Sequence, residues 1–323
     1  MGGAVIDAMH GAMTQDPDNG RAWRVIAAFA AVYLVWGSTY LAIRFAIETL
    51  PPFLMAATRF LIAGSVLHAW GRLRGDPAPA RAHLAPSFVL GALFLLFGNG
   101  GVVWAEQRIP SGLAALLVAV TPAWTVLFEW AHGGGMPGLR TVAGLAAGLA
   151  GVALLVAPSS LGGARLDLAG AAGCLLSSVS WSLASVRSRT MRLPPSPAIA
   201  SSLQMLAGGA LLLLVGLASG EAARVDLAAA STRSLLAVAY LVVFGSLVAF
   251  TAFTWLLQVS TPSRVATCAY VNPVVAVLLG WAFAGERLGT RSVVAAAAIV
   301  LGVVLITTGR SSARRAGRGR VEE

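Results

Sequence analysis

The sequence contains little charge and no lysine. Charged residues make up only 11% of the 323 residues, whereas hydrophobic residues make up 57%, and the mean hydropathy is +0.79. A water-soluble domain of this size has no interior large enough to hide that much apolar surface. The composition therefore argues against an ordinary soluble protein and indicates a membrane protein.

Cysteine, histidine and catalytic motifs are also scarce. The two cysteines, Cys174 and Cys268, lie inside apolar segments, which excludes a disulfide framework and favours a small buried role. Histidines occur only in tails or at segment ends, namely at His10, His68, His83 and His132. Because no HExxH, GxGD or Walker-type motif occurs, we expect no enzyme, no cofactor, no metal and no ATP hydrolysis by this chain.

Long apolar runs, in contrast, are abundant. A helix needs about 20 apolar residues to cross the roughly 30 Å of hydrocarbon in a bilayer, and ten segments approach that length. They are predicted near Val25–Ala46, Phe53–Trp70, Phe88–Trp104, Gly112–Trp130, Thr141–Ala157, Leu168–Val186, Ala198–Ala218, Leu235–Leu257, Val265–Phe283 and Ser292–Thr308. Residues 1–23 are expected to form a disordered cytoplasmic tail, and residues 309–323 a basic cytoplasmic tail.

The arginines predict the orientation of the chain. If the N-terminus is cytoplasmic, 15 of the 23 arginines fall on the inner side and 6 on the outer side. The positive-inside rule then places both termini of this multi-pass protein in the cytoplasm. The high pI, about 11.2, is explained by arginines that face the headgroups of the lipid bilayer, and nucleic acid is not expected as a partner.

The second half of the chain repeats the first. A shift of 151 positions aligns residues 118–156 with 269–307, and 15 of the 39 positions are identical. A shift of 145 positions pairs further landmarks, which are Trp36 with Trp181, Arg44 with Arg189, Pro52 with Pro197, Leu61 with Leu206 and Gly64 with Gly209. Since five helices per copy is an odd number, the second copy enters the membrane from the opposite face. We therefore predict an all-α membrane protein with ten transmembrane helices in two inverted five-helix repeats.

Three segments resemble the EamA family of the drug/metabolite transporter superfamily. They are VWGSTYLAIRFAIETLPPFLMAATRFLIAG from Val35 to Gly64, VTPAWTVLFEW from Val120 to Trp130, and YVNPVVAVLLGWAFAGERLGTRSVVAAAAIVLGVVLI from Tyr270 to Ile306. The resemblance implies one EamA repeat over residues 24–160 and another over 161–308. It also implies a plasma (inner) membrane location and, usually, export of amino acids, metabolites or toxic compounds.

One position departs from the family pattern. The family often carries a Gly-Glu pair after both the fourth and the ninth helix, but here Gly134-Gly135 stands at the first place and Gly285-Glu286 at the second. A function that needs two symmetric glutamates is therefore not expected. Gly285, Glu286 and Arg287 are interpreted as a tight hairpin after the ninth helix.

Arg59 is the clearest candidate for a substrate-binding residue. It lies about 10 Å into the second helix, judged by the rise per residue, and a buried charge in a membrane usually faces a cavity or a partner. Its repeat mate under the shift of 145 is Gln204. Arg59 is predicted either to bind a carboxylate or phosphate of the substrate, or to pair with Glu48 or cap helix carbonyls.

Other polar and aromatic side chains at membrane depth are candidates for the same cavity. The amides predicted there either line the pathway or only join helices, and the aromatic residues either form a cavity wall or pack in the core. The complete predicted cavity set is Trp36, Thr39, Tyr40, Arg59, Asn99, Trp181, Gln204, Tyr270 and Asn272.

Glu106 and Glu129 are candidates for coupling or gating. Glu106 follows the third helix on the outer side, and Glu129 lies at the inner end of the fourth. A carboxylate there either binds and releases a proton during transport, or is solvated or paired with arginine.

The pattern as a whole predicts a secondary active transporter that exports amino acids, small metabolites or drug-like compounds by alternating access. The alternatives are an exchanger of anionic metabolites and a non-transport bundle such as a channel or receptor. A small-molecule substrate is the expected partner. Gly144, Gly148 and Gly151 provide small-residue spacing for close helix packing, either within one chain or in a homodimer.

Overall fold

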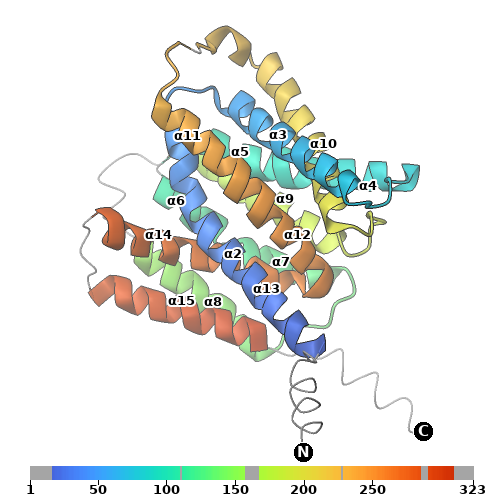
Figure 1. Ribbon diagram of the computed structural model, residues 1–323. Helices are drawn as coiled ribbons and strands as arrows, with labels where there is room; N and C mark the ends of the chain where they lie inside the picture. Colours follow the sequence, from blue (N-terminus) through green and yellow to red (C-terminus); the bar gives the residue numbers. More distant parts are fainter. Residues whose placement is uncertain (1–16, 110, 157–166, 227, 285–289, 309–323) are drawn as a thin grey trace, which may run out of the picture.

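The computed structural model describes residues 17–109, 111–156, 167–226, 228–284 and 290–308. These residues form helices and connecting loops, without strands (Figure 1). The helices are α2 (Pro17–Ala46), α3 (Pro52–Leu73), α4 (Arg81–Gly91), η1 (Ala92–Asn99), α5 (Gly100–Ala105), α6 (Ser111–Val118), α7 (Thr121–Ala131), α8 (Leu139–Val156), α9 (Leu168–Arg187), α10 (Pro197–Ala218), η2 (Glu221–Arg224), α11 (Thr232–Tyr240), η3 (Leu241–Phe250), α12 (Thr251–Val259), α13 (Pro262–Ala266), α14 (Cys268–Ala284) and α15 (Thr290–Thr308).

Each of the ten predicted apolar segments is helical, so the predicted fold class is confirmed. Seven helical stretches of the described chain are long and apolar enough to span a bilayer, and the helices over 139–154 and 293–308 are apolar but shorter. Four segments consist of consecutive pieces: α4–η1–α5, α6–α7, α11–η3–α12 and α13–α14. Large apolar side chains such as Leu34, Phe97 and Leu214 are exposed on the surface, as expected where lipid replaces water.

Repeat mates pack directly on each other. Helices α3 and α10 lie side by side, as do α8 and α15 (Figure 1). A Cβ on Gly64 would lie 3.0 Å from Leu206, and a Cβ on Gly209 would lie 3.0 Å from Leu61, so the same contact occurs twice with the repeats exchanged. This reciprocity is what a two-fold relation between the repeats requires, and the pairs were already matched by the shift of 145.

The glycines of α8 contact other helices of the same chain. A Cβ on Gly144 would lie 2.9 Å from the carbonyl oxygen of Gly302, and one on Gly151 would lie 2.9 Å from that of Ala295. Both partners are in α15. Gly148 instead makes room for the ring of Tyr270. The small-residue spacing therefore serves packing within one protomer.

Two helix boundaries differ from the prediction. Helix α2 begins at Pro17, so residues 17–23 are helical although they were assigned to the disordered tail. Proline at the first turn of a helix lacks only an N–H that would be unpaired anyway. The third span begins at Arg81, earlier than the predicted Phe88, so Pro86 lies inside α4. Because Pro86 has no backbone N–H, the carbonyl of Ala82 lacks its usual helical hydrogen bond. Ala82 is exposed, so water can solvate that carbonyl.

Irregular backbone occurs in corresponding spans of the two repeats. The π-helical segments η1 and η3 lie in the third and eighth spans, and the shift of 151 carries one onto the other. The fourth span is interrupted between α6 and α7 at residues 119–120, and the ninth between α13 and α14 at Thr267, three to four positions earlier under the shift of 151. Backbone of this kind at membrane depth is tolerated where it is buried in protein or lines a cavity.

Candidate functional site

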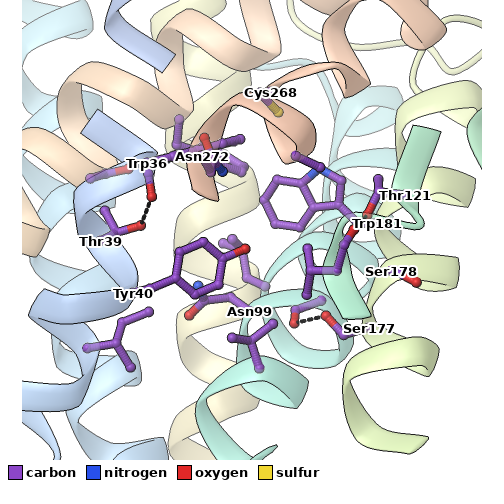
Figure 2. Close-up of a pocket in the computed structure, with 18 of the residues that line it drawn as sticks. Trp36, Thr39, Tyr40, Asn99, Thr121, Ser177, Ser178, Trp181, Cys268 and Asn272 are labelled. Carbon is purple, nitrogen blue, oxygen red and sulfur yellow. Dashed lines mark hydrogen bonds between the residues drawn. The ribbon is translucent and has the colours of Figure 1, made fainter. Parts of the chain in front are cut away.

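A central cavity lies between the two repeats, with a volume of about 90 Å³. Figure 2 shows Tyr40, Asn99, Trp181 and Asn272 arranged around it. The lining residues come from the first four spans and from the sixth, eighth and ninth, and they are Trp36, Thr39, Tyr40, Ile43, Arg59, Phe60, Leu95, Gly98, Asn99, Val102, Val118, Thr121, Ser177, Ser178, Trp181, Gly245, Phe250, Ala266, Cys268, Ala269 and Asn272. Ligand pockets are commonly about 300–1,000 Å³, so the cavity is contracted in this conformation.

Seven of the nine predicted cavity residues line this cavity together: Trp36, Thr39, Tyr40, Arg59, Asn99, Trp181 and Asn272. Tyr270 lies elsewhere, because its ring packs over Gly148 and its hydroxyl donates to the carbonyl of Leu145 at 3.2 Å. Gln204 also lies elsewhere, in a second cavity described below.

Arg59 is a buried cation without a carboxylate partner. Its side chain is 4% exposed, and Nε donates to the hydroxyl of Ser246 at 2.8 Å. The ion pairs among the described residues are Arg108–Asp167, Arg224–Glu221 and Arg233–Glu48, and Arg59 is in none of them. The predicted alternative of a pair with Glu48 is therefore wrong. A buried charge without a counter-ion is costly, so the position of Arg59 beside the cavity needs an explanation.

Gly245 is the reason that the guanidinium fits. A Cβ at this position would lie 2.8 Å from Nη2 of Arg59. The carbonyl of Gly245 also accepts a hydrogen bond from Nε1 of Trp36 at 3.2 Å. The π-helical segment η3 thus positions both the cation and one aromatic wall.

The two cavity amides have unused acceptor oxygens. Oδ1 of Asn99 and Oδ1 of Asn272 are buried and have no hydrogen-bond partner among the described residues. Tyr40 forms a hydrogen bond with the Asn272 side chain. Because buried polar atoms are normally paired, these two unpaired oxygens are unusual, and both belong to residues that line the cavity.

An aromatic cluster closes one side of the central cavity. It consists of Trp36, Phe94, Trp181, Phe250 and Phe253, whose rings pack with centroid distances of 4.9–6.4 Å. The repeat mates Trp36 and Trp181 touch at 5.4 Å, so the pseudo-two-fold axis passes between them. We call these five residues the aromatic barrier.

A second cavity of about 300 Å³ lies on the other side of the aromatic barrier. Its walls are residues 188–195 of the loop after α9 together with parts of η1, α10 and α12, including Phe94, Arg189, Gln204 and Gln258. Gln204 is 1% exposed, and its Oε1 has no hydrogen-bond partner within the described ranges of the chain. Repeat mates thus lie in different cavities: Arg59 in the central one and Gln204 in the second.

Glu106 is buried directly after α5. It is 1% exposed, and neither carboxylate oxygen has a hydrogen-bond partner among the described residues. Nη1 of Arg44 donates to the backbone carbonyl of Glu106 at 3.2 Å. Burial raises the pKa of the Glu106 carboxyl to about 8, although the nearby Arg44 opposes this shift.

The other predicted carboxylate, Glu129, is half-buried and bonded to its surroundings. Its side chain is hydrogen-bonded to Ser263 of α13, with Arg189 nearby. These contacts tie α7 to α13. Of the predicted hairpin residues, Gly285, Glu286 and Arg287 lie outside the described residues.

Several cavity residues were not predicted, above all Thr121, Ser177 and Ser178. Ser177 donates to the carbonyl of Gly98, as Figure 2 shows, and Ser182, one turn beyond Ser178, donates to that of Thr121 at 3.0 Å. A signal was present, because Ser177 and Ser178 precede Trp181 by one helical turn and share its face.

The geometry agrees with comparisons to known proteins. The model of the EamA-like transporter family matches residues 23–157 and 168–308. The chain belongs to this family.

EamA-like relatives match over most of this chain. The inner membrane transporter YedA of Escherichia coli K12 is 40% identical over 287 residues, covering 88% of this chain and 91% of YedA. The protein PecM of Dickeya dadantii is 28% identical, covering 84% of this chain and 88% of PecM. A crystal structure aligns with a TM-score of 0.71 at 25% identity and covers 88% of this chain and 97% of the other. The protein is therefore a membrane transporter by family.

Proposed function

We propose that this protein is a secondary active transporter of the inner membrane, with both termini in the cytoplasm, that exports small amphipathic solutes with an anionic group by alternating access. Amino acids with an apolar side chain are the proposed substrate class. The observation that carries the proposal is Arg59, which is 4% exposed, has no carboxylate partner among the described residues and lines the central cavity.

The rest of the cavity fits the same class of solute. A carboxylate binds a guanidinium through strong charge-assisted hydrogen bonds. Asn99 and Asn272 each offer a free acceptor oxygen for an ammonium group. Trp36 and Trp181 supply apolar surface for a side chain, and their faces also attract cations.

Exchange of sugar phosphates or nucleotide sugars is the less favoured alternative. Such solutes carry two or more negative charges, and Arg59 is the one basic residue among those lining the central cavity. A channel is disfavoured as well, because the aromatic barrier separates the two cavities with rings in contact. An inverted repeat instead supports rocking of one repeat against the other around a central site.

Counterflow in proteoliposomes tests the substrate class. Vesicles loaded with one amino acid are exposed to a labelled trace of the same compound, and competitors are added as matched pairs of an amino acid and its carboxamide, which differ in the carboxylate alone. Cationic dyes and phosphorylated metabolites complete the panel. We expect the amino acids to compete at least tenfold better than the amides, since losing a charge-assisted bond costs about 1.5–3 kcal/mol. Equal competition by both members of each pair would contradict the proposal.

A further inference from the structure

Glu106 continues the cavity-lining face of the third span toward its outer end. Asn99 and Val102 line the central cavity, and Glu106 follows Val102 by one helical turn, so the three residues share a face. The Glu106 carboxyl lies near Tyr40, another cavity residue. A carboxyl group thus lies buried one turn beyond the cavity, and neither oxygen has a hydrogen-bond partner in the part of the chain that the structure describes.

A compact apolar layer packs around Val103, one turn before Glu106, on the side of the cavity that the proposed orientation places outside. We call it the outer layer; its residues are Ala42, Ile43, Ala46, Met55, Val103, Ala237 and Leu241. On its edge, Arg44 of α2 donates to the backbone carbonyl of Glu106. In a state open to the outside, separation of α2 from α5 would break these contacts and expose Glu106 to water.

The charged and titratable groups around Glu106 come from several helices. Helix α2 contributes Tyr40 and Arg44, and α9 contributes Cys174. Near the start of α9, Arg108 and Asp167 pair with each other at 3.6 Å. Helix α3 carries Arg59, which donates to Ser246. The Arg44 side chain is exposed and donates to the backbone carbonyl, and none of the ion pairs among the described residues includes the Glu106 carboxylate.

We propose that Glu106 is a proton-binding site coupled to the outer closure: it holds a proton while the outer layer is packed, and releases it to the outer solution when α2 and α5 separate. This inference rests on the proposed transport function and orientation. The step is a reversible proton transfer between the Glu106 carboxylate and outer water, and it needs no further reactant.

The linkage gives the direction of the pH effect. In the closed form the pKa of Glu106 is raised to about 8, whereas exposure to water in the open form restores an ordinary value of about 4.3. Protonation of Glu106 therefore stabilises the closed form relative to the open form. This stabilisation is complete below about pH 4.3 and is lost as the pH rises toward 8. Between these two pH values, each unit of rising pH increases the ratio of open to closed molecules by up to about tenfold.

Labelling of Cys268 from the outer side tests the proposal without any substrate. Cys268 lines the central cavity and is 5% exposed. In a Cys174→Ser background, right-side-out vesicles are treated with a membrane-impermeant maleimide at pH 6 and pH 8. A higher pH also accelerates the reaction by forming thiolate, and it does so equally in all variants. The readout is therefore the labelling rate of the parent divided by that of Glu106→Gln, a variant whose side chain mimics protonated glutamate.

We expect this relative rate to rise at least tenfold from pH 6 to pH 8. Glu48→Gln is the matched control, because Glu48 is a half-exposed outer carboxylate paired with Arg233 at 3.8 Å; it should behave like the parent. If Glu106→Gln lowers the folded yield, Glu106→Met serves as a second uncharged reference of similar length.

A constant ratio between pH 6 and pH 8 would overturn the proposal, and it is the result expected if Arg44 simply neutralises an ionised Glu106. Loss of the pH response in the control variant Glu48→Gln would also overturn the proposal. Failure of the counterflow assay, by contrast, would leave the labelling result unchanged, so the two proposals fail separately.

Discussion

The proposed function depends most on one residue, Arg59. It is buried in the central cavity, bonded to Ser246 and accommodated by the missing side chain of Gly245. The sequence predicted its depth from its distance after Pro52. The absence of a carboxylate partner became visible only in three dimensions, because Glu48 lay close enough in sequence to be a plausible partner yet pairs with Arg233.

The first prediction concerns substrate affinity. Arg59→Gln should weaken apparent affinity about 10- to 150-fold, since a charge-assisted hydrogen bond contributes about 1.5–3 kcal/mol. Arg59→Lys should restore only part of it, because an ammonium cannot form a planar two-bond contact. Uptake is measured per folded molecule, with folded protein quantified by size exclusion in detergent. Unchanged affinity together with reduced folded yield would show a structural role instead.

The second prediction concerns a glycine. Gly148→Ala should destabilise the protein by about 1–3 kcal/mol, the usual range for overpacking, because the new Cβ would lie 2.5 Å from the ring of Tyr270. Denaturant unfolding in micelles measures the effect. Ala150→Val, at an exposed position of the same helix, is the control and should change stability little.

Combining Gly148→Ala with Tyr270→Ala separates this clash from a general loss of helix packing. If the clash is the cause, the double variant should be no less stable than Tyr270→Ala alone, because neighbouring sites are not additive. Additive losses would point to another origin.

At the scale of elements, the aromatic barrier separates the two cavities. Phe94 contacts Trp181, Phe250 and Phe253, and it borders the second cavity. Its removal should leave a gap where the rings now meet, since buried side chains are only partly replaced by relaxation of their neighbours.

The third prediction follows from this gap. Phe94→Ala should raise the labelling rate of Cys268 several-fold when a membrane-impermeant maleimide is applied to inside-out vesicles. Phe97→Ala lies on the same segment η1, with Phe97 largely exposed, and should not change the rate. Equal rates in the two variants would mean that the barrier lies elsewhere.

The elements differ in how far sequence alone could predict them. The ten segments and the repeat were predictable, because both rest on hydropathy and on identities in register. The aromatic barrier was not, since Phe94 and the exposed Phe97 are indistinguishable in an apolar segment. Tyr270 was misplaced for a related reason: an aromatic residue at membrane depth fits a core as well as a cavity. The π-helical segments carry no recognised composition signal.

At the scale of the whole molecule, the two repeats are not in equivalent environments. Arg59 lines the contracted central cavity of about 90 Å³, and its mate Gln204 lines the second cavity of about 300 Å³. The loop 188–195 beside the second cavity belongs to the inner side in the proposed orientation. Such one-sidedness is expected of one state in an alternating-access cycle, because the symmetric partner state would exchange the environments of the two repeats.

The fourth prediction tests the orientation. A reporter enzyme that is active only after export, fused behind Glu323, should remain inactive, because the arginine bias and the odd number of helices per repeat predict that both ends lie in the cytoplasm. A second fusion in the outer loop at Asp226 should be active and serves as the positive control. Activity of the terminal fusion would contradict the topology.

The reciprocal contact between α3 and α10 has a mechanical consequence. Leu61 faces Gly209, and Leu206 faces Gly64, so exchanging the conformations of the two repeats converts this contact into itself. An interface that looks the same before and after the exchange need not be broken to pass from one to the other. The contact between α3 and α10 can therefore stay unchanged during the transport cycle. The other helices would then move relative to this pair.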